Sequence, residues 1–264
     1  MEYQIIIVIL LNVLINVITT LSYSVKIVGI RTKRLAISFS LFNLLVLISR
    51  TANGFQSPIL ANSVEKNLLN GIDEDILNFR IIIFSCSLAT IIGALLIPTF
   101  QRFLTRYVND FQSTKSIFKS FLNLIREKVP AKLIIPKKEN LSFLKISSYD
   151  KFPWTIFLSN IFAVAILTIG VLSSVYAGYL NPDLRTTSSN LSAFVNGFAT
   201  ILMFAFIDPQ LSSLTDEVIH GNKSEGIFRK YISLMVFARL LGTIIAQVLF
   251  LPFAKLIATT SNIF

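Results

Sequence analysis

Six long apolar stretches dominate this sequence, and each is long enough to cross a lipid bilayer as an α-helix. They lie near residues 3–25, 35–55, 80–100, 155–178, 190–208 and 231–253. A helix needs about 20 mainly apolar residues to span the hydrocarbon core. The first stretch spans as it stands and has no small-residue cleavage site typical of a signal peptide. The sequence therefore predicts an all-α polytopic membrane protein with six transmembrane helices.

The composition supports this fold class and argues against several functions. Of 264 residues, 53% are hydrophobic and 14% are charged, whereas soluble domains carry about 25% charged residues. The single cysteine, Cys86, and the single histidine, His220, belong to no metal-ligand pattern. No phosphate-binding glycine loop and no nucleophile with a matching base can be traced. We therefore expect neither an enzyme nor an ATP-driven pump, and no cofactor or metal.

The basic residues concentrate in alternate loops and predict the orientation. Segment 26–34 holds four Lys and Arg, segment 101–153 holds eleven, and segment 209–230 holds three. The other loops hold Lys66 and Arg185, with Arg80 at an edge. By the positive-inside rule the basic loops face the cytoplasm and both termini lie outside. This topology accounts for the net charge of +10, so a nucleic-acid partner is not expected.

The long basic loop divides the chain into residues 1–100, 101–153 and 154–264. Between Phe100 and Val129, apolar residues recur at helical spacing with Lys and Arg between them. This pattern predicts a basic amphipathic cytoplasmic helix. One interpretation is an interfacial helix lying on the anionic inner leaflet; the other is that its cations also bind an anionic lipid headgroup.

Three spans precede this loop and three follow it, so equivalent helices of the two halves cross the membrane in opposite directions. This layout is typical of transporters with inverted-topology repeats. Weak echoes such as Gly93 with Gly242 support a repeat. Small residues four apart favour close helix packing, within one protomer or at the seam of a homodimer. They are Ser85, Ala89 and Gly93; Gly170, Ser174 and Gly178; and Ala238, Gly242 and Ala246.

Two arginines fall inside predicted spans, where a charge is costly. Arg239 lies near the middle of MVFARLLGTII, and Arg50 lies near the outer end of its span. Arg50 has the alternative of reaching the outer headgroups, and Arg239 that of pairing with a carboxylate. Asp208, directly before Pro209, is the only acid near a span. Otherwise the partner is an anionic ligand, since guanidinium matches phosphate oxygens.

Uncharged polar residues extend this pattern along the spans. Asn12, Asn16, Thr19 or Thr20, and Tyr23 follow one face of the first span; Ser192, Asn196 and Thr200 follow one face of the fifth; Asn43 lies in the second. They predict either a polar cavity for an anionic headgroup or ordinary hydrogen bonds between helices. The candidate substrate-binding residues are Arg50, Arg239, Asn53, Gln56, Thr51, Arg80, Asn16 and Asp208.

The stretch SYSVKIVGIRTKRLAISFSLFNLLVLISRTANGFQSPILA, together with FAFIDPQLSSLTDE and the six-span layout, resembles the Amj family of bacterial lipid II flippases. The likeness covers nearly the whole chain and is sharpest at 30–32 and 49–58. It implies a transporter in the bacterial cytoplasmic membrane whose substrate is lipid II, the undecaprenyl-pyrophosphate-linked disaccharide peptide of peptidoglycan synthesis. That lipid would move from the inner to the outer leaflet.

Other functions stay open at this point. One is a flippase of another polyprenyl-linked or anionic lipid. A second is a non-transporting membrane scaffold, in which the polar residues only join helices. A membrane-embedded lipid-modifying enzyme would need a base or nucleophile that the sequence does not reveal. Because six helices enclose little space and the lipid II headgroup is bulky, a homodimer is also expected.

Overall fold

The computed structural model describes residues 2–72, 75–114 and 154–263. Within these residues the chain is almost entirely helical, has no strand, and contains six helical segments long and apolar enough to cross a membrane. The prediction of a six-span, all-α, multi-pass membrane protein is confirmed. The elements are α1 (Glu2–Thr32), α2 (Leu35–Leu69), α3 (Ile76–Thr114), α5 (Trp154–Leu180), α6 (Arg185–Leu202), the π-helical turn η4 (Met203–Ile207), α7 (Asp208–Ile219) and α8 (Glu225–Thr260).

The helices extend well beyond the predicted spans. The sequence prediction ended the second span at 55, after the polar residues that follow Arg50, but α2 continues as far as Leu69. Polar side chains do not stop a helix, whereas glycine in the left-handed conformation does. Gly71, with φ of +62°, ends α2, and the Ile72 N–H bonds the Asn67 carbonyl 2.9 Å away. Arg50 therefore lies near the middle of its helix, which corrects its predicted place near the outer end.

Proline does not end the fifth span either. The prediction placed a helix break before Pro209, but α6 runs through η4 into α7. In η4 the Asp208 N–H bonds the Met203 carbonyl, five residues back instead of four. Because Pro209 has no N–H to donate, the wider π turn accommodates it without a break. Asp208 thus stands at a local irregularity inside a long helix.

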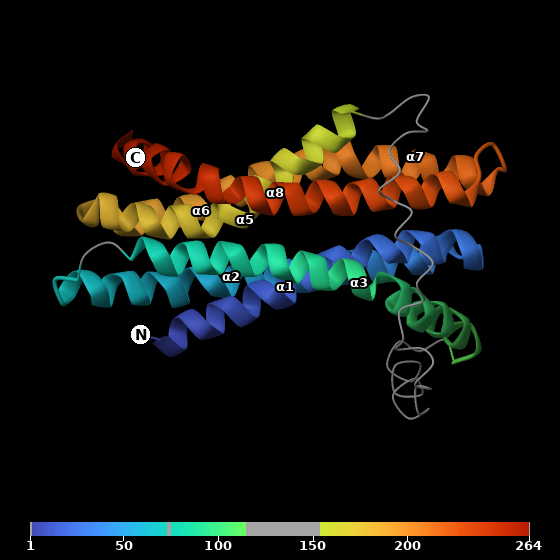
Figure 1. Ribbon diagram of the computed structural model, residues 1–264, viewed down its shortest axis with the longest axis horizontal. Coiled ribbons are helices and arrows are strands. Elements are labelled where there is room, and N and C mark those ends of the chain that lie inside the picture. The colour runs from blue at the N-terminus through green and yellow to red at the C-terminus, as the bar shows by residue number, and fades with distance from the viewer. Residues whose placement is uncertain (1, 73–74, 115–153, 264) are drawn as a thin grey trace.

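The helices form two groups of three. In the first group α1 packs along both α2 and α3, and in the second α5 packs along both α6 and α8. The groups meet mainly where α3 contacts α8 and α2 contacts α5 (Figure 1). This similarity of packing agrees with an inverted repeat, although the repeat itself stays a prediction.

Small residues bring helices close within each group. A Cβ atom at Gly242 of α8 would lie 2.7 Å from the Ile161 carbonyl oxygen of α5, and one at Gly93 of α3 would lie 2.8 Å from the Thr20 Cβ of α1. Ala89, Ala238 and Ala246 are fully buried in the same protomer. The small-residue faces of α3 and α8 are thus covered inside the chain. They are not available as the seam of a homodimer, which corrects the predicted position of that seam.

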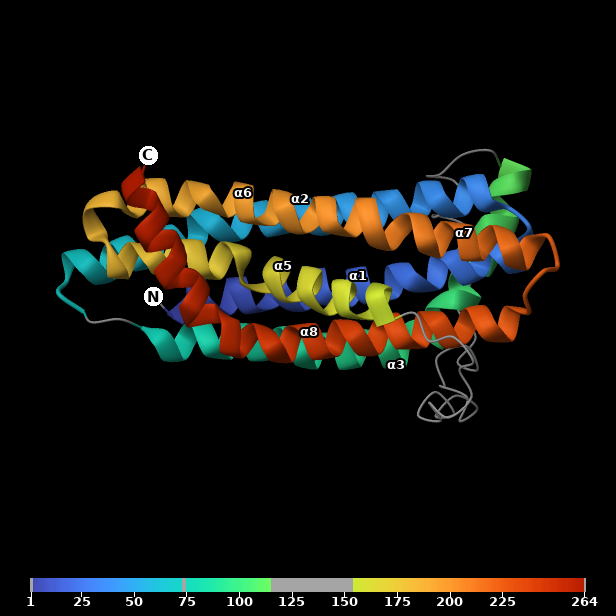
Figure 2. The ribbon, with the colours of Figure 1, turned by 90° about the horizontal axis from the view of Figure 1, so that it is seen from above.

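Both ends of the described chain lie at one end of the bundle, together with the α2–α3 and α5–α6 turns (Figure 2). The α1–α2 and α7–α8 turns lie at the other end, where Arg31, Lys33, Lys223 and Arg229 gather. The predicted loop 26–34 is shorter than expected, because α1 continues to Thr32 and includes Lys26.

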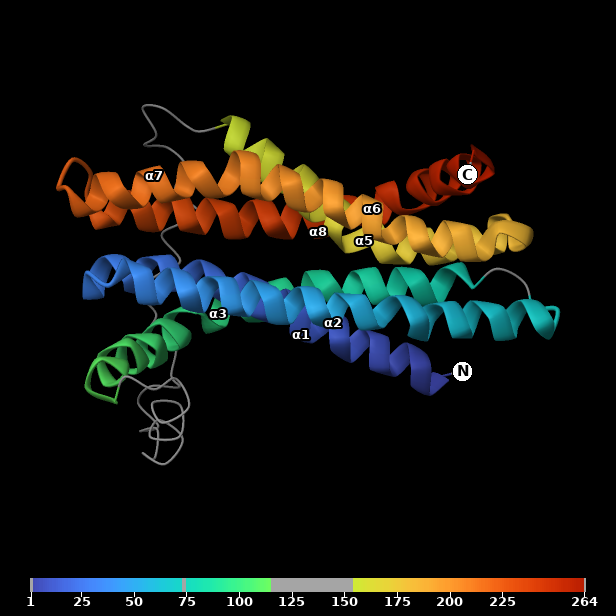
Figure 3. The same ribbon diagram turned by 180° about the vertical axis from the view of Figure 1, so that it is seen from behind.

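The predicted amphipathic helix begins as the last part of α3. This helix passes Pro98 and bends away from the bundle toward its end at Thr114 (Figure 3). Its apolar residues Leu104 and Val108 are buried in a cluster with Val25 and Val28 of α1. The Arg34 Nη1 donates to the Val108 carbonyl at 3.0 Å. This part of the apolar face packs against α1, and the interfacial position of the helix stays a prediction. The rest of the predicted helix, residues 115–129, lies outside the described residues.

Candidate functional site

A pocket lies between the two groups of helices, about halfway along the bundle; its cavity volume is about 90 Å³, and it is partly open to the surroundings. It collects five of the eight predicted site residues. Its lining is Asn12, Ile15, Asn16, Thr19, Ser22 and Tyr23 of α1; Phe42, Val46, Ser49, Arg50 and Asn53 of α2; Val164, Leu167 and Thr168 of α5; Met203 and Ile207 of η4; Asp208 of α7; and Arg239 of α8.

Arg239 crosses the pocket from α8 to α1. Its Nη2 donates to the Asn16 Oδ1 at 3.0 Å and also contacts the Thr19 Oγ1. The buried Nε has no hydrogen-bond partner among the described residues. No described carboxylate pairs with this guanidinium, since Asp208 is engaged elsewhere. A buried cation held only by neutral oxygens, with an N–H to spare, is suited to an anionic ligand.

Arg50 reaches the same pocket from α2. Its Nη1 contacts the Thr200 Oγ1 of α6, and its guanidinium carbon lies 5.6 Å from the centre of the Phe204 ring. The Nε is again buried without a described partner. The alternative that Arg50 reaches the outer headgroups is wrong, because the side chain points across to η4 and α6 from the middle of α2.

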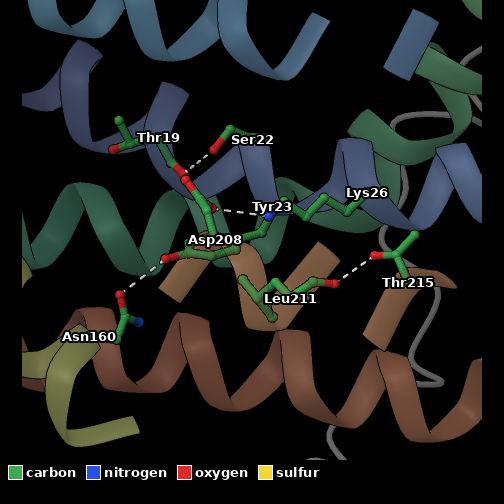
Figure 4. A network of polar contacts seen from close by, with 8 residues as sticks. All are labelled: Thr19, Ser22, Tyr23, Lys26, Asn160, Asp208, Leu211 and Thr215. Atoms are coloured by element: carbon green, nitrogen blue, oxygen red, sulfur yellow. Dashed lines mark hydrogen bonds and ion pairs between the residues drawn. The ribbon is translucent and has the colours of Figure 1, made fainter. Parts of the chain in front are cut away.

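Sequence reasoning missed the ion pair beside the pocket. Lys26 of α1 and Asp208 of α7 are joined by an Nζ–Oδ1 contact of 3.1 Å, and their side chains are 2% and 21% exposed (Figure 4). The sequence prediction placed Lys26 in a cytoplasmic loop because it ended the first span too early. The apolar neighbours Val25, Ile27 and Val28 were the sequence signal that the helix continues through the lysine.

Neutral polar side chains fix the wall between α1 and the second group. The Tyr23 hydroxyl donates to the Asn160 Oδ1 at 3.4 Å (Figure 4). The Asn160 Nδ2 donates to the Met235 carbonyl at 2.9 Å. The polar stripe predicted on the first span therefore faces inward as expected. The fifth-span stripe contributes the contact to Arg50 through Thr200, but it does not line the pocket. Asn43 is exposed, so its predicted inward direction is wrong.

Three predicted site residues lie apart from the pocket. Thr51 is exposed and its hydroxyl donates to the Leu47 carbonyl of its own helix at 3.0 Å. Gln56 is buried, with its Nε2 unpaired among the described residues. Arg80 donates to the Gln247 carbonyl of α8 at 3.3 Å. On α2 a turn of about 3.6 residues places Arg50 and Asn53 on one face and rotates Thr51 away from it.

The comparisons with known proteins identify the family. The family model described as "Amj: Alternate to MurJ" matches residues 11–261. The chain belongs to the Amj family. It is 35% identical over 251 residues to the lipid II flippase Amj of Bacillus subtilis (strain 168), a match that covers 93% of this chain and 92% of the relative. No solved structure matches the chain. The family resemblance drawn from the sequence is thereby confirmed.

Proposed function

We propose that this protein is a lipid II flippase of the bacterial cytoplasmic membrane. It would move undecaprenyl-pyrophosphate-linked disaccharide peptide from the inner to the outer leaflet, as a transporter and not as an enzyme. The similarity to a relative named lipid II flippase supports this substrate. The observation that carries the proposal is the convergence of Arg50 and Arg239 on one pocket, each with a buried Nε that lacks a partner among the described residues.

The pocket suits the pyrophosphate of such a lipid. Arg50 and Arg239 supply guanidinium groups that match phosphate oxygens, and Asn53 and Ser49 add neutral hydrogen-bonding groups beside them. The unfilled space is too small for the disaccharide and peptide as well. The sugar and peptide would therefore extend beyond the pocket, and the undecaprenyl chain would stay in the surrounding lipid. Because both arginines line the same pocket, one pyrophosphate could contact both of them.

Substitution of the two arginines tests this proposal. Loss of a charged hydrogen-bonding partner weakens binding by about 10- to 100-fold. We expect Arg239→Ala to impair flipping most and Arg50→Ala less, because Arg50 is half-buried and Arg239 is fully enclosed. Arg50→Lys keeps the charge without the planar fork, so it should retain partial activity. The measurement is headgroup exposure of lipid II in reconstituted vesicles and in cells that depend on this protein.

Membrane abundance of each variant is the control. A scaffold without transport activity would show wild-type exposure of lipid II in all three variants at normal abundance, and that result would remove the proposed site. Replacing lipid II by another polyprenyl-linked anionic lipid in the same vesicles distinguishes the narrower substrate from the broader class.

The orientation proposed here places both termini outside and residues 101–153 in the cytoplasm. The basic end of the bundle supports it, since Arg31, Lys33 and Lys223 gather there. Impermeant thiol labelling of intact cells tests it in a variant without Cys86. Labelling of Ser113→Cys but not of Asn262→Cys would reverse the orientation.

Two further parts of the proposal concern assembly and energy. The small pocket and the bulky headgroup favour a homodimer, through a surface other than the buried small-residue faces; a fully active species with the mass of a monomer in a native-like membrane would exclude it. We also propose that either the membrane potential acts on the anionic substrate or no coupling ion is obligatory, because Asp208, the one acid among the described residues lining the pocket, already pairs with Lys26. A proton or sodium dependence that Asp208→Asn abolishes would contradict this.

A further inference from the structure

We propose that Lys26 is a further binding residue for the phosphate groups of the lipid headgroup. While the pocket is empty, the Asp208 carboxylate pairs with the Lys26 ammonium and neutralises its charge. On this proposal an entering phosphate displaces the Asp208 carboxylate from the Lys26 ammonium. The inference rests on the proposed function, because it assigns a third cation to the same anionic substrate.

The position of Lys26 supports this role. Its ammonium lies 3.1 Å from Asp208 and 4.8 Å from the centre of the Phe42 ring. Both Asp208 and Phe42 line the pocket, whereas Lys26 does not. The lysine therefore stands directly behind two side chains of the pocket wall. Movement of the carboxylate alone would expose a positive charge to the pocket.

The ion pair is also hard to explain as a packing device. Desolvation of a buried ammonium and carboxylate commonly costs as much as their attraction returns, and an apolar pair of similar size would pack equally well. An ammonium has three donors, yet among the described residues that of Lys26 donates only to Asp208. The remaining donors are available to phosphate oxygens.

The backbone around Asp208 is irregular. Asp208 follows the π turn η4 and precedes Pro209, which can donate no backbone hydrogen bond. Such π turns occur frequently at functional sites. The two residues of the pair also belong to different halves of the molecule, Lys26 to α1 and Asp208 to α7. Exchange of partners on Lys26 would therefore break an ion pair that joins the two halves.

The charges agree with a pyrophosphate lipid. The net charge around the pocket is plus two, because three cations, Arg50, Arg239 and Lys26, are offset by one carboxylate, Asp208. Each of the two phosphate groups of a pyrophosphate diester carries one negative charge, so the occupied site is neutral with Asp208 still ionised. Exchange of partners needs no additional ion, in agreement with the absence of an obligatory coupling ion proposed above.

The binding experiment uses full-length protein in nanodiscs and farnesyl pyrophosphate, a short-chain probe, with calorimetric titration. Asp208→Asn frees Lys26, so it should bind the probe about tenfold more tightly, whereas Lys26→Met should bind about tenfold more weakly. The double variant K26M/D208N leaves no unpaired buried charge, and it should bind more weakly than D208N. Tighter binding in D208N should accompany slower flipping, because the headgroup leaves more slowly.

Arg31→Gln is the matched control, because Arg31 forms an exposed ion pair with Glu225 at 2.7 Å that also joins α1 to the second group. It should bind the probe like the wild type. A second readout is infrared difference spectroscopy, in which addition of the probe should shift the Asp208 carboxylate band, identified by its absence in D208N. A merely structural ion pair would leave this band in place.

The outcomes separate the two proposals. If the wild type binds the probe, Arg50→Ala and Arg239→Ala weaken it, and K26M and D208N bind like the wild type, the role of Lys26 is wrong and the proposed function stands. The role of Lys26 is equally wrong if K26M and D208N change the affinity in the same direction or if the carboxylate band does not move. If the wild type does not bind the probe, both proposals are overturned.

Discussion

The contact between α5 and α8 differs from the contact between α2 and α6. In the apolar stretches of α5 and α8, 67% and 44% of residues are buried, against 11% for both α2 and the span that contains α6. Gly242 lets α8 approach the α5 backbone closely, whereas α2 and α6 touch at few places. One of these is the hydroxyl pair Ser57 and Ser189, 3.2 Å apart.

This difference indicates different structural roles for these helices. The α5–α8 and α1–α3 pairs form the stable frame. The other two helices, α2 and α6, form the cover and have few contacts between them. Segments with few buried contacts open at lower free-energy cost than packed cores. The seam between α2 and α6 is therefore where we expect a lipid headgroup to enter the pocket while its chain remains in the membrane.

The largest effect is expected from filling the glycine at the α5–α8 contact. In Gly242→Leu the new side chain meets the Ile161 carbonyl oxygen and the Val164 side chain. A backbone oxygen cannot move aside, so the loss of stability should reach about 3 kcal/mol or more. The measurement is the thermal unfolding midpoint of the purified protein, together with its abundance in the membrane.

Gly197→Leu on α6 is the matched control, because no atom lies within 4 Å of its added Cβ. It should be neutral or stabilise the helix by roughly 0.5–1 kcal/mol, since leucine favours helix more than glycine does. Equal destabilisation by the two variants would show that α6 is packed as tightly as α8. The proposed difference between the frame and the cover would then be wrong.

A reversible crosslink between α2 and α6 should show whether these helices must move apart for flipping, without disturbing the fold. In a Cys86→Ser background, Ser57→Cys with Ser189→Cys should form a disulfide across the seam and stop flipping, with recovery on reduction. The matched control is Ser87→Cys with Thr243→Cys, whose native hydroxyls lie 3.1 Å apart between α3 and α8. This second disulfide also joins the two halves, but within the frame, so flipping should continue. Flipping that persists with the seam fully crosslinked would place the entrance elsewhere.

The sequence predicted the frame better than the cover. Apolar runs located all six helices, because the hydrophobic period and length are local properties. The helix ends were wrong at Arg50 and at Pro209, because a polar face turned toward a pocket resembles a loop in a linear reading. Lys26 of the frame helix α1 was also misplaced, because a lysine near a predicted span end is ordinarily counted as a loop charge.

The candidate site was predicted in part. Arg50, Arg239 and Asn16 were found because polar groups within apolar runs demand a partner. Thr51 was included by proximity in sequence, although helical geometry turns it away from Arg50. The partnership of Lys26 with Asp208 could not be predicted, because it joins residues from the two halves of the chain and depends on the tertiary contact between α1 and α7.

The smallest effect is expected where an exposed ion pair joins the two cover helices. Arg185 of α6 and Glu65 of α2 are 2.9 Å apart, and their side chains are 43% and 50% exposed. Solvent screens such a pair, so Glu65→Gln should change stability by at most about 0.5 kcal/mol, and still less in high salt.

If the seam between α2 and α6 opens during transport, the Glu65→Gln variant should flip lipid slightly faster at low ionic strength. Glu225→Gln, which breaks the comparable pair with Arg31 between α1 and α8, should leave the flipping rate unchanged. A large loss of stability in Glu65→Gln would instead mean that α2 and α6 are held together as firmly as the frame.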